Sequence, residues 1–163
     1  MDYITIETLH NLKSVGFSYP EYEHLLNRGM IYCYEGTEYF VGGFSNHGFT
    51  PKDIEVVRSG VWLPTAIQLM KWLNNTDFVF TLTSDENDYY TVLATDAVNG
   101  ARYKGGGLTP ANALAKTIFK ICKSHQREYK PRTTLRLSII GEADDRGQGD
   151  GSLVPFQSDS KTE

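Results

Sequence analysis

The segment of the sequence that most constrains the fold is residues 109 to 124. Thr109 is a residue type that favours the N-cap of a helix, and Pro110 suits the first helical position. Apolar residues follow at helical spacing, so we expect them to face inward. They are Ala111, Leu114, Ala115, Ile118 and Cys122. The pattern predicts a helix from Pro110 to about Ser124.

The residues before this helix have the features of β-hairpins. Residues 78 to 83 alternate large apolar side chains with valine and threonine, and residues 89 to 94 are equally β-prone. The polar residues 85 to 88 lie between them and predict a turn. Asn99-Gly100 predicts a second tight turn, after which the chain returns as a third strand around Tyr103.

The first half of the chain predicts a short helix and another hairpin. Residues 5 to 15 show near-helical apolar spacing, with Thr5 as the N-cap and Gly16 as the stop. Between Met30 and Gly42, two strand-like runs flank a turn at residues 35 to 38. Further along, Thr50-Pro51 predicts a single helical turn.

Residues 63 to 75 predict a second amphipathic helix. Leu63-Pro64-Thr65 starts it, because proline is tolerated in a first turn, and Asn74-Asn75 ends it. We expect one apolar face, made of Ala66, Ile67, Met70 and Leu73.

Together these elements predict the fold class α+β, with an antiparallel sheet of hairpins packed with about three helices. The chain of 163 residues, 40% of them hydrophobic, is enough for one core, so we expect a single domain over residues 1–140 that includes a strand at 133 to 140. Residues 141–163 are poor in apolar side chains and predict a flexible acidic tail. Cys33 and Cys122 are expected to be reduced core thiols. The sequence has no apolar run of membrane-spanning length, so we expect a cytoplasmic protein with no membrane partner.

The net charge of −4 hides a strong asymmetry. Residues 101 to 136 contain nine basic residues and one acid, whereas residues 142 to 163 contain six acids and two basic residues. A basic segment followed by an acidic tail favours association of the two within the chain.

The glycine-rich segment before the last helix is a candidate anion-binding corner. It leads through Leu108 into a helix N-terminus, whose free N–H groups and dipole favour a phosphate or carboxylate. The alternative is a flexible connection into a well-capped helix, since neither a P-loop nor a dinucleotide fingerprint is present. The candidate residues are Arg102, Lys104, Gly105, Gly106, Gly107 and Thr109.

A second candidate is a basic face on the last helix, formed by Lys116, Lys120, Lys123 and Arg127 at positions i, i+4, i+7 and i+11. This stripe is either a solvated helix face or a binding surface for nucleic acid or another polyanion. Exposed Tyr89, Tyr90 and Tyr103 beside it would favour a binding surface.

The sequence contains no recognisable catalytic or metal-binding motif. The four histidines lack metal-ligand spacing, and the acids at 85, 86 and 88 do not fit a calcium-binding loop. No nucleophile elbow is present. We therefore expect no catalytic residue, no metal and no cofactor, although an enzyme of unrecognised type assembled from distant residues remains the alternative.

Three local patterns together resemble a known group of proteins. They are residues 4 to 9 with Leu12-Lys13 and Gly16-Phe17, then Trp62-Leu63-Pro64-Thr65, and finally Leu108-Thr109-Pro110 with the Ala-Leu-Ala-Lys run at 113 to 116. Over residues 4 to 124 they resemble small uncharacterised proteins of bacteriophages and prophages, which share a helix, a Trp-x-Pro-Thr helix, a hairpin and a closing Thr-Pro helix. This chain departs from the simplest members in its longer segment at 44 to 60 and its acidic tail.

The resemblance offers no catalytic residue to carry over, and it implies the setting of a mobile genetic element. With the basic segment, it predicts a non-enzymatic accessory protein that binds a host protein or a small anionic ligand in the bacterial cytoplasm. A specific form of this hypothesis is capture of a nucleotide signal of bacterial defence by the glycine corner with Arg102 and Lys104. Nucleic acid is a further candidate partner, and self-association into a homo-oligomer is left open.

Overall fold

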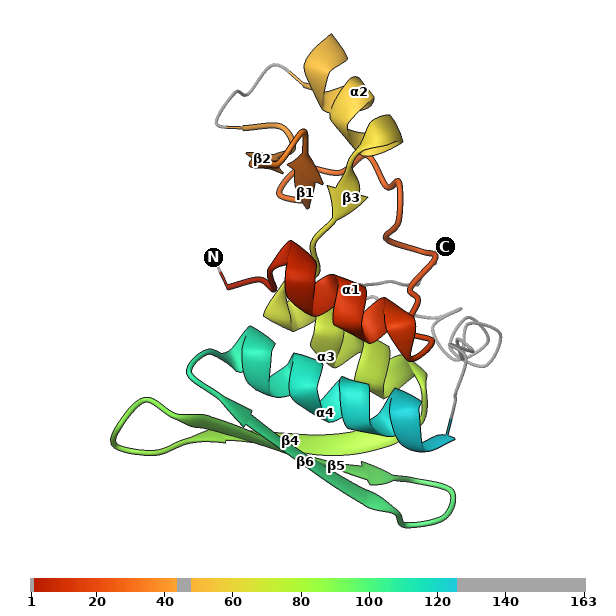
Figure 1. Cartoon of the computed structure of the whole chain (residues 1–163), viewed down its shortest axis with the longest axis vertical. Coiled ribbons are helices and arrows are strands. Elements are labelled where there is room, and N and C mark those ends of the chain that lie inside the picture. Colours follow the sequence, from red (N-terminus) through yellow and green to blue (C-terminus); the bar gives the residue numbers. More distant parts are fainter. Residues whose placement is uncertain (1, 44–47, 126–163) are drawn as a thin grey trace, which may run out of the picture. The chain divides into compact units, whose positions relative to one another are not determined.

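A computed structural model describes residues 2–43 and 48–125 of the chain, and within them the fold is α+β, as predicted. The helices are α1 (Ile6–Ser14), α2 (Pro51–Ser59), α3 (Ala66–Asn75) and α4 (Pro110–His125) (Figure 1). The strands are β1 (Ile31–Tyr34), β2 (Thr37–Phe40), β3 (Val61–Trp62), β4 (Phe78–Ser84), β5 (Tyr90–Asp96) and β6 (Arg102–Gly107). This part of the chain thus holds four helices where about three were expected, and two three-stranded sheets in place of one.

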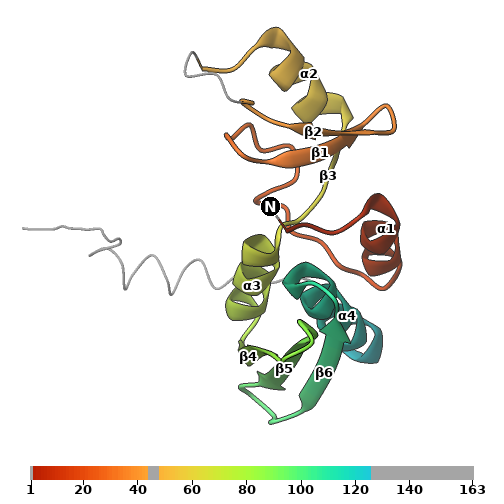
Figure 2. The same cartoon turned by 90° about the vertical axis from the view of Figure 1, so that its left-hand side faces the viewer.

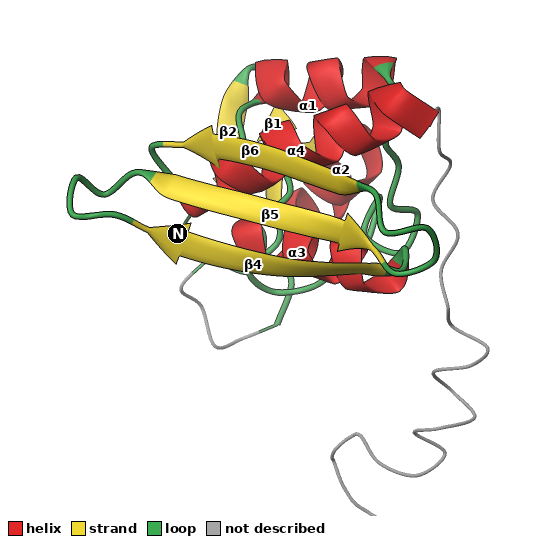
Figure 3. Cartoon of the chain, turned by 90° about the horizontal axis from the view of Figure 1, so that it is seen from below, coloured by secondary structure: helices red, strands yellow, loops and turns green. Residues whose placement is uncertain are grey.

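The larger sheet has the order β4-β5-β6 and is antiparallel throughout. It confirms the hairpin at 78 to 94 and the third strand around Tyr103. The helices α3 and α4 cover one face of this sheet, and in the view from below no helix of the described residues lies over its other face (Figure 3). Inward side chains such as Phe78, Val92 and Ala94 are buried, whereas outward ones such as Val79 are exposed.

The smaller sheet has the order β2-β1-β3, with α2 beside β1 (Figure 2). The turn between β1 and β2 consists of Glu35 and Gly36 only, both at positive φ (50° and 78°), and the next two residues already belong to β2. Two-residue turns with positive φ at both positions match the twist of the paired strands. The third strand, β3, pairs Trp62 with Tyr32, and its two residues are too few to show a periodic pattern.

Helix α2 is longer than the single turn that Thr50-Pro51 predicted, and extends over nine residues. A capping box forms its start: the Thr50 hydroxyl accepts from the Asp53 N–H (3.1 Å), and the Asp53 carboxylate accepts from the Thr50 N–H (2.7 Å). The buried Asp53 carboxylate also accepts from the Gly42 N–H and the Tyr39 hydroxyl, which ties this helix to the β1–β2 hairpin. Tertiary contacts therefore stabilise a helix that has few apolar residues of its own.

Helix α3 begins at Ala66, directly after the three residues Leu63-Pro64-Thr65 that were predicted to start it. Pro64 lies before the N-cap, and Thr65 takes the cap in a capping box with Gln68. The predicted apolar face was partly wrong, because Ile67 is 64% exposed and Met70 is only half-buried. The buried residues are Ala66, Leu69, Trp72 and Leu73, which follow the i, i+3, i+6, i+7 spacing of one helix face.

The first and last helices confirm their predicted caps. The Thr5 side chain accepts from the Thr8 N–H, and Gly16 follows the helix at a φ of 97°. The Thr109 hydroxyl accepts from the Asn112 N–H (3.1 Å). Helix α4 ends at His125, one residue beyond the predicted end.

One cluster of buried apolar residues connects both sheets to the helices. Trp72, Tyr19 and Tyr32 are its largest fully buried side chains, and the Leu63 N–H donates to Ile31 O (2.8 Å) where the chain passes from β3 to α3. Neither of the two cysteines forms a disulfide; Cys122 is buried, as predicted, whereas Cys33 is only half-buried. The predicted strand at 133 to 140 and the acidic tail lie outside the described residues.

Candidate anion-binding groove

The three consecutive glycines lie in β6 and do not form a loop. Gly105 and Gly106 pair with Val92 and Thr91 of β5. A Cβ atom at Gly105 would collide with the Thr117 hydroxyl oxygen and lie 2.8 Å from Ala113 O, both in α4. Glycine is therefore required here because β6 and α4 approach each other too closely for a side chain.

The N-terminus of α4 is occupied by acceptors from the chain itself. The Ala111 N–H donates to the Asp2 carboxylate (2.6 Å), and the Asn112 N–H donates to the Thr109 hydroxyl (3.1 Å). An acid at this position interacts favourably with the helix dipole. Two of the N–H groups that were predicted to bind an external anion thus have acceptors within the protein.

A groove of about 640 Å³ lies beside β6 and α4. From the sheet it is lined by Tyr89, Thr91, Lys104, Gly105 and Gly106, and from α4 by Lys116, Phe119, Lys120 and Lys123. All four lysines are exposed, and no acidic residue is among the lining residues. The lining therefore concentrates positive charge from two elements in one concave surface.

The edge of β6 that lies away from β5 borders this groove. The Asp96 N–H donates to Ala101 O (2.8 Å), so Ala101, the residue just before β6, directs its backbone polar groups toward β5. In an antiparallel strand each residue directs its N–H and C=O to the same side, and the side alternates along the strand. Gly105 therefore faces β5, and its neighbours Lys104 and Gly106 direct their backbone polar groups away from it.

One of these edge groups is bound by a groove lysine. Lys120 Nζ donates to Lys104 O (2.6 Å), which connects α4 to the strand edge. Within residues 2–43 and 48–125 the structure records no partner for the N–H of Gly106. Among the described residues, the recorded contact of this strand edge is thus the one from Lys120.

Two aromatic side chains contribute flat apolar surface to the groove. The Tyr89 ring lies over the backbone of Gly106, where an added Cβ would be 2.7 Å from the ring, and Tyr89 is 41% exposed. On the helix side, Phe119 is half-buried, and Lys123 Nζ lies 5.9 Å from the centroid of its ring. Such surfaces favour ligands that combine negative charge with a ring or an apolar chain.

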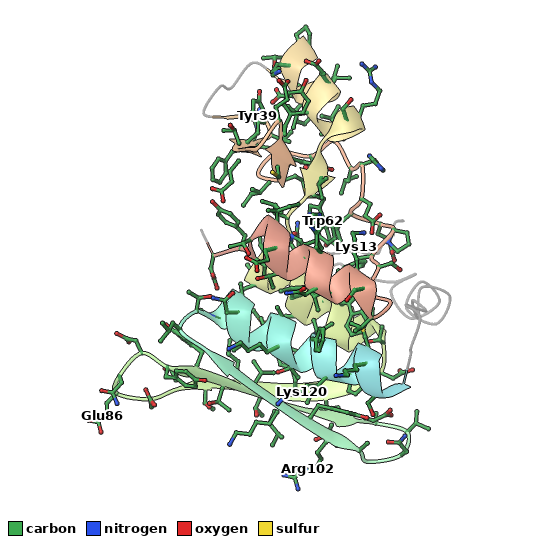
Figure 4. All side chains as sticks on the ribbon, in the orientation of Figure 1. Lys13, Tyr39, Trp62, Glu86, Arg102 and Lys120 are labelled. Carbon is green, nitrogen blue, oxygen red and sulfur yellow. The ribbon has the colours of Figure 1, made fainter. Side chains whose placement is uncertain are left out.

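The groove combines parts of both candidate sites from the sequence. Lys104, Gly105 and Gly106 of the predicted corner lie in one lining with Lys116, Lys120 and Lys123 of the predicted basic face. Gly107, Thr109 and Arg102 are not in the lining, and Arg102 projects from the sheet on the side away from the helices, apart from Lys120 (Figure 4). Arg127 lies outside the described residues.

The three tyrosines named beside the basic helix have different environments. Tyr89 is exposed and lines the groove, whereas Tyr90 is half-buried, and Tyr103 is half-buried with its ring 6.1 Å from that of Phe78. Thr91 and Phe119 were not among the residues chosen from the sequence. Phe119 lies three residues after Lys116 and four before Lys123, so helical spacing alone could have placed it on the same face as these lysines.

A second, smaller pocket of about 320 Å³ is lined by His10, Lys13, Glu23, His24, Tyr32, Gly60, Val61 and Trp62. Three of its titratable groups make structural contacts: Lys13 Nζ pairs with Glu23 at 3.1 Å, and Nδ1 of His24 lies 3.0 Å from Val57 O. Burial raises the pKa of Tyr32 to about 12, against the effect of the hydrogen bond that its hydroxyl donates to Leu25 O. These contacts hold the segment after α1 in place and assemble no nucleophile with a base.

The described residues include no group of three or more histidine, cysteine or acidic side chains that could hold a metal ion. In the same part of the chain, no helix combines the length and apolar character needed to cross a membrane.

Comparisons with protein-family models, with curated proteins and with solved structures found no match for this chain.

Proposed function

We propose that this protein is a non-enzymatic binding protein that holds an anionic ligand in the groove beside β6 and α4. The observation that carries the proposal is that Lys104, Lys116, Lys120 and Lys123 all line one concave surface without an acid in its lining. Lysines from two separate elements with no neutralising partner in the lining attract phosphate or carboxylate groups. A solvated helix face would account for the three lysines of α4, but not for a lysine of β6 in the same lining.

The groove also has the size and the apolar component of a ligand site. Its volume of about 640 Å³ falls within the range of about 300–1,000 Å³ that is usual for small-molecule sites. Tyr89 and Phe119 supply ring surfaces on which a nucleobase or an apolar side chain can pack. The resemblance to bacteriophage and prophage proteins supports a setting inside a bacterial cell, with a host protein segment or a nucleotide signal as the ligand.

Titration calorimetry and thermal unfolding of the full chain test the proposal with tripolyphosphate, ATP and a cyclic dinucleotide at low salt. We expect at least one of them to bind and to raise the melting temperature, since a ligand bound only by the folded state stabilises it. Binding should weaken with added salt. The double variant Lys116→Glu/Lys123→Glu should lose binding.

Lys71→Glu is the matched control, because Lys71 is exposed on α3 and does not line the groove. It should bind as the natural protein does. The proposal is wrong if no anion and no acidic peptide binds, or if the groove double variant and the Lys71 variant bind equally well.

Nucleic acid is a second candidate ligand, favoured by one observation. Lys116, Lys120 and Lys123 are all exposed along one side of α4, which is the arrangement of a helix that follows a phosphate backbone. Fluorescence anisotropy with oligonucleotides of increasing length separates this candidate from a small-ligand site. Affinity that rises with oligonucleotide length and falls steeply with salt would support it, and affinity equal to that of a mononucleotide would exclude it.

A further inference from the structure

We propose that the ligand of this groove is an extended acidic peptide segment that pairs with β6 as a fourth strand of the larger sheet. This inference rests on the proposed function and names the chemical class of its ligand. It is argued from the backbone groups at the strand edge together with the lysines around it.

The strand edge offers donors and acceptors together. Lys104 and Gly106 each direct an N–H and a C=O away from β5, and the alternation adds Arg102 to this set. A phosphate ligand could accept from the N–H groups, but it would offer no donor to the carbonyl oxygens and would lie close to their negative ends. A peptide backbone supplies both kinds of group in the same alternating order, which is the basis of strand addition to a sheet edge.

The spacing of the helix lysines fits side chains on an added strand. Lys116 and Lys120 are four residues apart, or about 6 Å along a helix axis at 1.5 Å per residue. Alternate residues of a strand point to the same face and are about 6.7 Å apart. Because α4 packs along β6, acids at positions i and i+2 of the added strand would lie opposite successive lysines.

Lys120 has a specific role in this exchange. In the free protein its Nζ donates to Lys104 O, and an added strand would take over that carbonyl oxygen with a backbone N–H. The ammonium group released in this way would be available to a carboxylate of the peptide, and a hydrogen bond between two charged groups is stronger than one to a carbonyl. The lysine therefore protects the edge of the free protein and binds the ligand in the complex.

The test begins with selection of binders from a random library of peptides about ten residues long, with the full chain as bait. We expect the selected peptides to carry Asp or Glu at alternate positions. In fluorescence polarisation, a selected peptide should bind Lys116→Glu at least about tenfold more weakly than the natural protein, which corresponds to about 1.4 kcal/mol. Lys71→Glu should bind it within about twofold, and urea unfolding of both variants checks that they fold.

Backbone methylation separates strand pairing from charge attraction. Two versions of a selected peptide are made, each methylated on alternate backbone nitrogens, so that each has one of its two edges blocked with its charge unchanged. Because only one edge of the added strand faces β6, one version should lose binding by at least about tenfold while the other retains it. Equal binding of the two versions would overturn the strand inference.

The outcomes also separate this inference from the proposed function. Binding of tripolyphosphate or ATP without selection of any acidic peptide would overturn the inference and leave the proposed function standing. Binding of an oligonucleotide alone, with length-dependent affinity, would do the same. If neither a peptide nor any anion binds the full chain, both are wrong.

Discussion

Thr117 of α4 lies against the backbone of Gly105 in β6, so closely that a Cβ atom at Gly105 would be 2.7 Å from the Thr117 nitrogen. The Thr117 hydroxyl is itself held in place, because it donates to Ala113 O at 2.9 Å. Since the Thr117 hydroxyl and the Thr117 nitrogen both belong to the helix, a side chain at Gly105 can be accommodated only if α4 moves. The position of the helix lysines relative to the β6 edge therefore depends on this contact.

Replacement of Gly105 by alanine should destabilise the protein by about 2–3 kcal/mol, the upper part of the range for overpacked cores. Urea unfolding measures the loss. Gly106→Ala is the matched control, because the added Cβ would meet the end of the exposed Tyr89 side chain, which can move. That variant should lose less than about 1 kcal/mol, and equal losses in the two variants would show that the helix contact is not limiting.

Asp53→Asn should destabilise the protein by about 2 kcal/mol at pH 7, because the buried carboxylate accepts hydrogen bonds from Thr50, Gly42 and Tyr39. An amide group cannot accept them all. Asp88→Asn is the control, since Asp88 is exposed in the β4–β5 turn and its replacement should change stability by less than about 0.5 kcal/mol. Urea unfolding of both variants provides the comparison.

The same residue predicts a pH dependence. Burial acts to raise the pKa of Asp53, but hydrogen bonds from Thr50, Gly42 and Tyr39 outweigh it and lower the pKa below its ordinary value of 3.8. The unfolded chain then binds more protons near pH 4, so the stability contributed by Asp53 is complete above that value and lost as the pH falls through the lower folded value. The difference in unfolding free energy between the natural protein and Asp53→Asn should therefore shrink below about pH 4. A constant difference down to pH 2 would contradict this.

Tyr32 should ionise about two pH units later than an ordinary tyrosine, because burial raises its pKa from 10.0 to about 12. A raised pKa means that the contribution of Tyr32 to stability is complete below pH 10 and is lost as the pH rises through about 12. Absorbance at about 295 nm after rapid pH jumps measures its ionisation, as the difference between the natural protein and Tyr32→Phe. In urea the difference should appear near pH 10, and a midpoint of 10 in the folded protein would count against the assigned environment.

Asp2→Ala should lower stability by about 1 kcal/mol, because it removes the carboxylate that accepts from the Ala111 N–H at the start of α4. The expected fall in melting temperature is about 3 °C for a protein of this size. Asp2→Asn retains an oxygen acceptor without the charge and should show a smaller fall. Circular dichroism measures all three proteins, and an unchanged Asp2→Ala would mean that this cap contributes little.

The sequence predicted best the elements with strong local signals. The alternation over residues 78 to 83 and the Thr109-Pro110 helix start each indicated their element within a few residues. Helix α2 was underestimated because it has few apolar residues, although Thr50 and Asp53 have the spacing of a capping box. The glycines of β6 were assigned to a loop because local signals cannot reveal that a helix lies against them.

The candidate site was predicted only where it follows helix periodicity. Lys116, Lys120 and Lys123 could be grouped from their spacing, because residues four and three apart share a helix face. Lys104 was placed in a separate site, since only the folded structure brings β6 beside α4. The edge position of β6 depends on strand order, and no local pattern in residues 102 to 107 encodes that.

The lysines around the β6 edge also have a consequence for contacts between copies of the protein. An uncovered strand edge can pair with the same edge of another molecule, which is a common start of aggregation. Two copies that approached in this way would bring Lys104, Lys116 and Lys120 of each molecule against those of the other. Their mutual repulsion opposes edge-to-edge self-assembly, so the charge that we propose attracts an acidic ligand also disfavours pairing of two copies at this edge.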